Sequence, residues 1–234
     1  MVRISDRLRT VAHMCEKGAV VADIGTDHGY LPIYLVHEGI ARSAIAMDLR
    51  KGPLDKAKKH ICDNCLEDRI QTRLSDGLEK LSANEADIIT ICGMGGRLIA
   101  DIVTKGMNVI TRNTTLIVSP QSEVGDFRHF LVSQRLVVDD EKMLKEDGKY
   151  FIIKCRKSDE NVYCEYSETQ YQYGWKLLES KDKTLYEYLI KEKETNDGIS
   201  NSLKKDESNP TVKLRLQQLL QKNNIIMDAL SYYD

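Results

Sequence analysis

The feature that most constrains the fold is an alternation along the first two thirds of the chain. Short runs of β-branched and apolar residues alternate there with segments of helical periodicity, as in βαβ units with parallel strands. The apolar runs predict strands at 19–24, 43–47, 70–74, 86–92 and 115–119. The segments between them predict helices near 30–39, 52–65, 95–107 and 122–133. The chain is therefore expected to be an α/β protein with a mainly parallel sheet.

The pattern changes after the fifth predicted strand. Two further strands are expected at 136–143 and 150–156, and Glu146-Asp147-Gly148 between them is a hairpin signal. Five parallel strands closed by an antiparallel hairpin form a Rossmann-like sheet with an antiparallel last strand. This order is typical of class I methyltransferases and not of dinucleotide-binding proteins.

A helix is also predicted before the first strand, capped by Ser5 or Asp6. Its apolar residues recur at helical spacing: Ile4, Leu8, Val11 and Cys15.

Helical periodicity without strand signals fills the last third of the chain. Asn209-Pro210 is a favourable helix start, and the pattern predicts two long antiparallel helices that resemble a short coiled-coil hairpin. Gly198 and its polar neighbours predict a break or loop at 196–201.

The composition shifts near Ser158, which predicts two domains, 1–158 and 159–234. An aromatic cluster near this boundary is expected to pack between the domains, with RNA stacking as the alternative. Its members are Tyr163, Tyr166, Tyr171, Tyr173 and Trp175.

Composition excludes little about partners. The formal net charge of −2 gives no general argument for nucleic-acid binding, although local basic patches remain compatible with it. Long apolar stretches and a signal-peptide pattern are missing, and the six cysteines are scattered. Cys62 and Cys65 form a lone CxxC with His60 close by, but a fourth ligand is missing. We therefore expect a cytoplasmic protein with no membrane segment and no metal.

An acidic, glycine-rich turn follows the first predicted strand. Its spacing is Asp23-x-Gly25-x-Asp27-x-Gly29, where a dinucleotide fingerprint would read G-x-G-x-x-G. Carboxylates here would repel a pyrophosphate but attract the cationic sulfonium and ammonium groups of S-adenosylmethionine. An ordinary βα turn is the alternative.

Two later segments carry acidic residues at the same sheet edge. Asp48 ends the second predicted strand, where a carboxylate accepts ribose hydroxyls of an adenosine, whether from a nicotinamide cofactor or from S-adenosylmethionine. Asp76-Gly77 follows the third strand and suits an adenine ring, although Asp-Gly is also a common turn.

Three glycines then occur within four residues, in Gly93-Met94-Gly95-Gly96. Their place at the end of a central strand predicts close approach of the backbone to a ligand, at the edge that faces a transferring methyl group in this fold.

Together these segments resemble the bacterial TrmK family. The resemblance rests on Asp-Ile-Gly-Thr-Asp-His-Gly-Tyr-Leu-Pro at 23–32, Gly52-Pro53, Ser75-Asp76-Gly77-Leu78 and Cys92-Gly93-Met94-Gly95-Gly96. It implies a tRNA methyltransferase that uses S-adenosylmethionine and acts on N1 of adenine 22. It also implies a helical, coiled-coil-like C-terminal domain.

The resemblance also implies site residues. The expected cofactor-binding residues are Asp23, Gly25, Thr26, Asp27, Gly29, Tyr30, Asp48, Asp76, Gly77 and Gly93. The expected catalytic residues are Asp27, His28, Gly93 and Met94. Ser119-Pro120-Gln121 departs from a Gln-Pro-Asn-like segment of relatives, which leaves a role for Gln121 open.

Adenine N1 has a free lone pair, so the reaction is chiefly a matter of positioning, and Asp27 would stabilise the charge of the methylated base. The base is expected to flip out of its helix. Arg3, Arg7, Arg9 and Arg97 are the expected contacts to tRNA phosphates, with a solvated helix face as the alternative. A monomer is expected.

Three other functions remain open. They are a small-molecule methyltransferase, a non-catalytic protein that binds the cofactor or RNA, and, as the weakest, a nicotinamide dehydrogenase.

Overall fold

The computed structural model describes residues 2–158, 165–204 and 208–234. It divides into two compact units, Met1–Cys164 and Glu165–Asp234. The sequence places the boundary near 158, and the residues between that point and the second unit lie outside the described part, Tyr163 of the aromatic cluster included.

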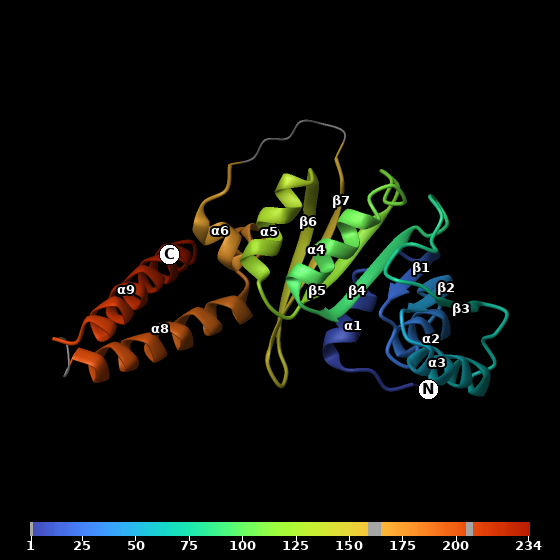
Figure 1. Cartoon of the computed structure of the whole chain (residues 1–234), viewed down its shortest axis with the longest axis horizontal. Helices are drawn as coiled ribbons and strands as arrows, with labels where there is room; N and C mark the ends of the chain where they lie inside the picture. The colour runs from blue at the N-terminus through green and yellow to red at the C-terminus, as the bar shows by residue number, and fades with distance from the viewer. Residues whose placement is uncertain (1, 159–164, 205–207) are drawn as a thin grey trace. The chain divides into compact units, whose positions relative to one another are not determined.

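The first unit is built on a seven-stranded sheet in the order β3-β2-β1-β4-β5-β7-β6 (Figure 1). β1 to β5 are parallel, and β7 runs antiparallel to both of its neighbours, β5 and β6. The predicted Rossmann-like methyltransferase sheet is thus confirmed. The strands are β1 (Ala19–Ile24), β2 (Ala41–Asp48), β3 (Ile70–Leu74), β4 (Ile88–Met94), β5 (Thr115–Pro120), β6 (Leu136–Lys145) and β7 (Lys149–Lys157).

Strand ends differ from the prediction most clearly at β4. The strand begins two residues later than predicted. Asp87, just before it, still bonds β1, because its N–H donates to the Val20 carbonyl at 2.9 Å and its carboxylate accepts the Val20 N–H at 2.8 Å. The strand then continues through Gly93 to Met94, with a register shift against β5 between Cys92 and Met94. This irregularity lies in the glycine-rich segment that the sequence singled out.

Five helices accompany these strands in the described part of the first unit. They are α1 (Asp6–His13), α2 (Tyr30–His37), α3 (Lys51–Asp63), α4 (Gly96–Lys105) and α5 (Val124–Ser133). The hydroxyl of Ser5 caps α1 by accepting a hydrogen bond from the Leu8 N–H at 3.3 Å, as predicted. The helix ends before Cys15, because the chain turns at Gly18, with φ of +83°, to enter β1.

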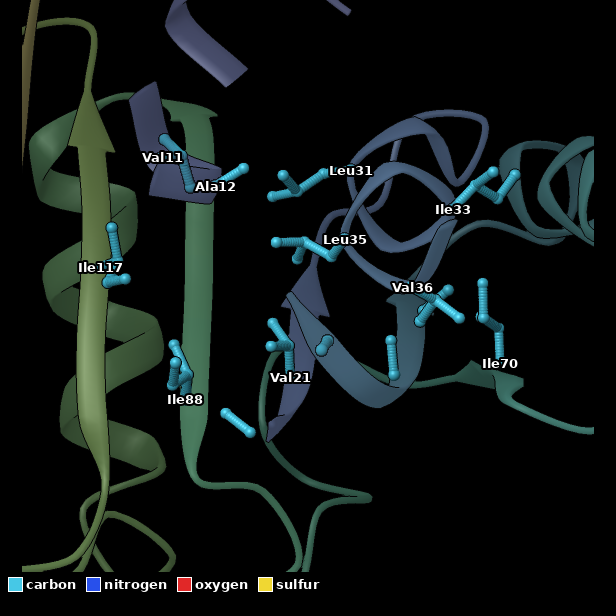
Figure 2. Close-up of a cluster of buried hydrophobic side chains, with 14 of the residues drawn as sticks. Val11, Ala12, Val21, Leu31, Ile33, Leu35, Val36, Ile70, Ile88 and Ile117 are labelled. Carbon is cyan, nitrogen blue, oxygen red and sulfur yellow. The ribbon is translucent and has the colours of Figure 1, made fainter. Parts of the chain in front are cut away.

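The core of this unit forms where α1 and α2 pack on the sheet (Figure 2). Val11 of α1 and Leu35 of α2 are fully buried with Val21, Ile88 and Ile117 from three strands. Burying one such side chain contributes about 1.5–3 kcal/mol. The two helices are thereby fixed against the strands whose carboxyl ends carry the predicted site.

The second unit is helical. Its helices are α6 (Glu168–Tyr173), α7 (Trp175–Glu179), α8 (Lys183–Leu203) and α9 (Pro210–Ser231). α8 and α9 run antiparallel, side by side (Figure 1). Lys222 of α9 pairs with Glu192 of α8 at 2.8 Å. Asn209 caps α9 and Pro210 occupies its first turn, as the sequence indicates.

The predicted break at 196–201 is wrong, because α8 continues through it to Leu203. Asn196 is buried and donates a hydrogen bond to Asn223 of α9 at 3.1 Å. Gly198 stays helical, since one glycine costs a helix only about 1 kcal/mol. The helical pattern around 177 and 178 also belongs to the separate short helix α7 and not to α8.

Three described aromatic residues of the predicted cluster, Tyr166, Tyr171 and Trp175, contact one another within the second unit. The Tyr166 ring stacks on Trp175 with centroids 3.9 Å apart, and Tyr171 meets Trp175 edge to face. The Tyr173 hydroxyl donates a hydrogen bond to Glu192 at 2.9 Å. Packing of this cluster between domains stays a prediction.

Candidate active site

A cavity of about 560 Å³ opens at the carboxyl ends of β1, β2 and β4, the edge at which open α/β sheets bind their ligands. It draws on six separate segments of the first unit. Its walls are formed by Arg7, Leu8, Asp23, Ile24, Gly25, Asp27, Tyr30, Leu31, Asp48, Leu49, Arg50, Ser75, Asp76, Gly77, Cys92, Gly93, Met94, Leu98, Ile102 and Gln121.

The β1 turn supplies one wall. Asp23 is 6% exposed, and its carboxylate accepts a hydrogen bond from the Thr90 hydroxyl at 2.7 Å. Burial raises the pKa of Asp23, and this hydrogen bond opposes the rise. Gly25 has a φ of +72° and its N–H donates to the Met47 carbonyl at 2.8 Å. This positive φ favours glycine, and a Cβ at Gly25 would in addition displace the Met94 methyl group.

Asp48 closes the next strand. It is 6% exposed, and one carboxylate oxygen accepts the Arg50 N–H at 2.7 Å. The neighbouring Leu49 is 62% exposed although it lines the cavity. The other oxygen of Asp48 is free to accept from a ribose hydroxyl, and the apolar Leu49 side chain can contact the flat base attached to that ribose.

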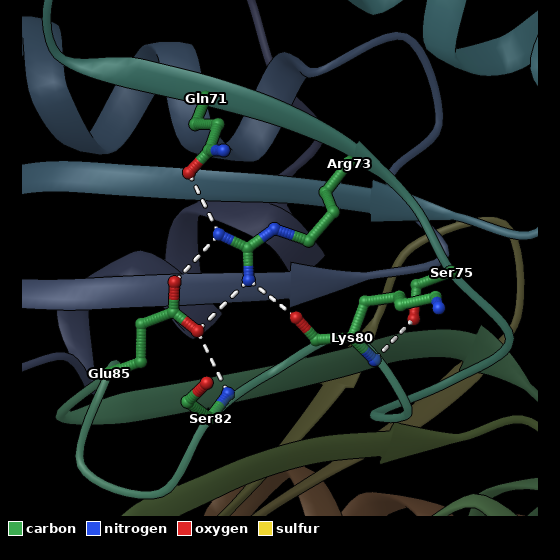
Figure 3. A network of polar contacts seen from close by, with 6 residues as sticks. All are labelled: Gln71, Arg73, Ser75, Lys80, Ser82 and Glu85. Atoms are coloured by element: carbon green, nitrogen blue, oxygen red, sulfur yellow. Dashed lines mark hydrogen bonds and ion pairs between the residues drawn. The ribbon is translucent and has the colours of Figure 1, made fainter.

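The loop that follows β3 brings Asp76 and Gly77 to the cavity. A polar network fixes this loop (Figure 3). Both guanidinium ends of Arg73 donate to Glu85, at 2.9 and 2.6 Å, and the Ser75 hydroxyl accepts the Lys80 N–H at 3.1 Å. The Asp76-Gly77 backbone is therefore held at the sheet edge by a bidentate ion pair and not only by its own turn.

The glycine-rich end of β4 is held by hydrogen bonds from Gln121, the residue that follows β5. The Gln121 N–H donates to the Met94 carbonyl at 2.9 Å. In the amide orientation that satisfies both neighbours, Gln121 Nε2 lies 3.2 Å from the Gly93 carbonyl oxygen, and Oε1 lies 3.1 Å from Arg7 Nη1. The predicted methyl-transfer edge thus meets α1 through Gln121.

Asp27 lies at the mouth of the cavity. Its side chain is 83% exposed and pairs with His28 Nε2 at 3.2 Å. His28 has a φ of +62°, and its Nδ1 lies 3.4 Å from the Tyr30 hydroxyl. The Tyr30 ring lines the cavity and stacks on His60, with centroids 5.3 Å apart.

Ten of the residues predicted from the sequence line this one cavity. They are Arg7, Asp23, Gly25, Asp27, Tyr30, Asp48, Asp76, Gly77, Gly93 and Met94. Thr26, His28 and Gly29 belong to the same turn but do not line it. Gly29 is instead the left-handed residue that begins α2, and it packs close to Ala57 of α3.

The four predicted tRNA-binding arginines are not brought together at the cavity. Arg7 lines it, whereas Arg3, Arg9 and Arg97 are exposed and lie outside its wall. Arg9 pairs with Asp6 one turn earlier, at 3.0 Å. Arg7 therefore stands apart from the other three.

Sequence reasoning missed several wall residues: Leu8, Ile24, Leu31, Leu49, Arg50, Ser75, Cys92, Leu98 and Ile102. Two signals would have found some of them. Leu49 directly follows a ligand-facing acid at a strand end, and Leu98 and Ile102 share one face of α4 at i,i+4 spacing.

No group of three or more His, Cys, Asp or Glu side chains is placed to hold a metal ion among the described residues. Cys62 and Cys65, the lone CxxC, are both exposed free thiols. Over the same residues, the helices lack the combination of length and apolar character needed to span a membrane.

Comparison with known proteins gives matches over this unit and over the whole chain. Residues 4–153 match a family described as "Methyltransferase domain". A curated tRNA (adenine(22)-N(1))-methyltransferase of Bacillus subtilis is 43% identical over 150 residues, which span 64% of this chain and 63% of that protein, slightly under two thirds.

Solved structures extend the match to the helical unit. The crystal structure of the B. subtilis M1A22 tRNA methyltransferase TrmK is 32% identical, with a TM-score of 0.84 over 98% of this chain and 100% of that one. A putative tRNA (m1A22) methyltransferase of Streptococcus pneumoniae in complex with S-adenosyl-L-methionine is 30% identical. It aligns over 97% of this chain and 100% of that one, with a TM-score of 0.82.

The sheet order, the acidic turn after β1 and these matches lead to one assignment. The chain belongs to the methyltransferase-domain family and, within it, to the TrmK methyltransferases.

Proposed function

We propose that this chain transfers a methyl group from S-adenosylmethionine to N1 of adenine 22 in tRNA. The observation that carries the proposal is the cavity, which gathers the acidic turn, Asp48, Asp76 and the Gly93-Met94 edge from four strand ends. Family membership and the activity named for the B. subtilis relative support the acceptor.

The cavity residues fit S-adenosylmethionine. Gly25 and Gly77 both line the cavity with positive φ and without a side chain, which allows a close approach of a ligand to the backbone there. Four carboxylates, those of Asp23, Asp27, Asp48 and Asp76, suit a ligand with a sulfonium, an ammonium and two ribose hydroxyls. We propose that Asp48 holds the ribose and that Asp76 and Gly77 hold the adenine.

When bound, S-adenosylmethionine supplies an electrophilic methyl group. The protein's own task is then positioning, because adenine N1 carries a lone pair without help from a base. Gly93 and Met94 are fixed by Gln121, the residue that follows β5, and form the wall against which acceptor and donor are aligned. An edge fixed in this way would hold the acceptor adenine in one orientation.

Asp27 is proposed to stabilise the positive charge that methylation creates on the adenine ring. Its position in the cavity wall and its contact with His28 Nε2 at 3.2 Å support this role. His28 is proposed to orient Asp27 and to meet the edge of the base, although its ring lies outside the cavity wall. Tyr30, whose ring is already stacked on His60, offers a surface for a flipped-out base.

Further parts of the proposal concern the whole protein. We propose a methyltransferase domain over 1–158 and a helical domain over 159–234. The partner is tRNA, the compartment is the cytoplasm, and the active form is a monomer. Exposed Arg3, Arg9 and Arg97 are proposed phosphate contacts outside the cavity.

The test is transfer of labelled methyl groups from S-adenosylmethionine to unmodified tRNA transcripts. Label is expected in a transcript with adenine at position 22 and not in one with guanine there. Free adenosine and bulk metabolites serve as competing acceptors. Equal labelling of both transcripts would contradict the position, and labelling of a small molecule alone would favour the small-molecule alternative.

A further inference from the structure

The two arginines of the cavity wall lie in different surroundings. Of the two arginines in the wall, Arg50 lies beside Asp48, with Nε 3.7 Å from the carboxylate and a side chain that is 78% exposed. Arg7 stands at the Gly93 edge instead. A positive charge therefore lies beside the proposed methyl-transfer edge.

Arg7 is held in place from two directions. Its guanidinium carbon lies 4.9 Å from the centre of the Tyr150 ring, in cation–π geometry, and Nη1 contacts Gln121 Oε1 at 3.1 Å. The backbone is fixed as well, since the neighbouring Asp6 N–H donates to Glu146 in the β6–β7 hairpin at 3.2 Å. The side chain is thus oriented before any ligand arrives.

Gln121 joins this arginine to the methyl-transfer edge. Its backbone N–H binds the Met94 carbonyl and its side-chain Nε2 binds the Gly93 carbonyl. Its remaining polar atom, Oε1, accepts from Arg7. One residue therefore aligns two consecutive carbonyls of the edge and one guanidinium.

We propose that Arg7 is the oxyanion-binding residue of this cavity and that Gln121 is the positioning residue that holds it there. This deepens the proposed function and rests on it. A guanidinium at this edge attracts an anionic group of a ligand, whereas the four carboxylates of the wall attract its cationic groups. A fork of N–H donors matches a carboxylate or a phosphate in charge and shape.

Two sources present such an oxyanion to this edge. One is the carboxylate of the cofactor's amino acid portion, and the other is a phosphate next to the target adenosine. Both share the chemistry that Arg7 recognises, and a pair of measurements distinguishes them.

The first measurement compares calorimetric affinities for S-adenosylmethionine and for decarboxylated S-adenosylmethionine, which keeps the sulfonium and the ammonium. If Arg7 holds the carboxylate, the natural cofactor binds the wild type about tenfold or more tightly than the decarboxylated form. Arg7→Ala brings this ratio close to one. Arg42→Ala, at the opposite end of β2, leaves it unchanged, and Arg7→Gln repeats the measurement with a variant that retains more side-chain packing.

The second measurement covers the phosphate. If Arg7 holds a phosphate, Arg7→Ala leaves the cofactor ratio unchanged and raises KM for tRNA more than it lowers kcat. In a plot of log affinity for tRNA against log salt concentration, the magnitude of the slope then falls by about one, as expected for the loss of one phosphate contact. Arg42→Ala again serves as the control.

Gln121 is tested by two substitutions with opposite expectations. Gln121→Glu places a carboxylate next to the Arg7 guanidinium, where it competes with the oxyanion of the ligand. It should therefore reduce the affected measurement, the cofactor affinity ratio or the tRNA salt dependence, more than the apolar Gln121→Met does. A purely structural role gives the reverse order, because Met leaves Arg7 and the Gly93 carbonyl without a polar partner. Gln134→Glu, in the turn after α5, is the matched control.

The proposal is overturned if Arg7→Ala changes neither the cofactor ratio nor the tRNA salt dependence beyond the Arg42→Ala control. The calorimetric arm needs no tRNA. Failure of tRNA methylation is therefore distinguishable from failure of the oxyanion site.

Discussion

At the residue scale, the cavity depends on carboxylates that use one oxygen for a hydrogen bond within the protein and keep the other for a ligand. Asp48 uses one carboxylate oxygen for the Arg50 N–H and is otherwise buried at a strand end. Asp87 accepts a backbone N–H in the same way, but at the opposite edge of the sheet. Comparing Asp48 with Asp87 therefore distinguishes a carboxylate that binds a ligand from one that has only a structural role.

Asp48→Asn is expected to weaken S-adenosylmethionine binding about tenfold or more, because a hydrogen bond to a charged group contributes about 1.5–3 kcal/mol. The amide keeps an acceptor for Arg50, so the melting temperature should change little. Isothermal titration calorimetry measures the affinity, with Asp87→Asn as control. Equal losses in both variants would refute the assignment of Asp48.

A second prediction uses two glycines that both have a positive φ. Gly25 and Gly18 have φ of +72° and +83°, but only Gly25 has a neighbour, Met94, where a Cβ would lie. Alanine at either position should cost stability by about 1–2 kcal/mol. Only Gly25→Ala should also abolish cofactor binding, and calorimetry beside thermal melting checks both. Cofactor binding that survives in Gly25→Ala would argue against close backbone approach at this turn.

At the scale of elements, the α8–α9 pair is joined by a polar cluster around Glu192. Burial would raise the pKa of this carboxyl, but Lys222, Tyr188 and Tyr173 all bond it, and the net effect lowers its pKa. A carboxyl with a lowered folded-state pKa stabilises the fold above its unfolded value and loses that contribution as pH falls. The contribution is therefore full at neutral pH and declines below about 4.5.

Glu192→Gln should accordingly reduce the opening free energy of α8 and α9 by about 1–3 kcal/mol at pH 7. The difference from the wild type should shrink as pH falls below about 4.5. Hydrogen exchange of the α8 and α9 amides measures it. Exposed Glu179, 3.5 Å from Lys176, provides the control Glu179→Gln, which should change little. A difference that stays constant with pH would contradict the role of the charge.

Local signals explain why most elements were predictable. β-branched runs, glycine-rich turns and the Asn209-Pro210 start each lie within a few residues of the element they specify. The end of α8 was missed because its continuation depends on Asn196 pairing with Asn223, on another helix. Tertiary contacts of this kind outweigh a single local glycine.

At the scale of the whole molecule, the sequence predicts the sheet and most of the cavity for the same reason. Parallel strands with right-handed crossovers place their carboxyl ends at one edge, so motifs that follow strands converge there. Asp23, Asp48, Asp76 and Gly93 were found this way. The contact of Arg7 with Gln121 was not, because these residues are far apart in the chain and only the folded wall brings them together.

The most direct test of the central claim is the identity and position of the modified nucleoside. Unmodified tRNA is incubated with the protein and S-adenosylmethionine, digested with a nuclease at neutral pH, and analysed by mass spectrometry of the fragments and nucleosides. The account predicts 1-methyladenosine in the fragment that contains position 22. N6-methyladenosine, a methyl group elsewhere, or no methylation of tRNA despite measurable cofactor binding would contradict it.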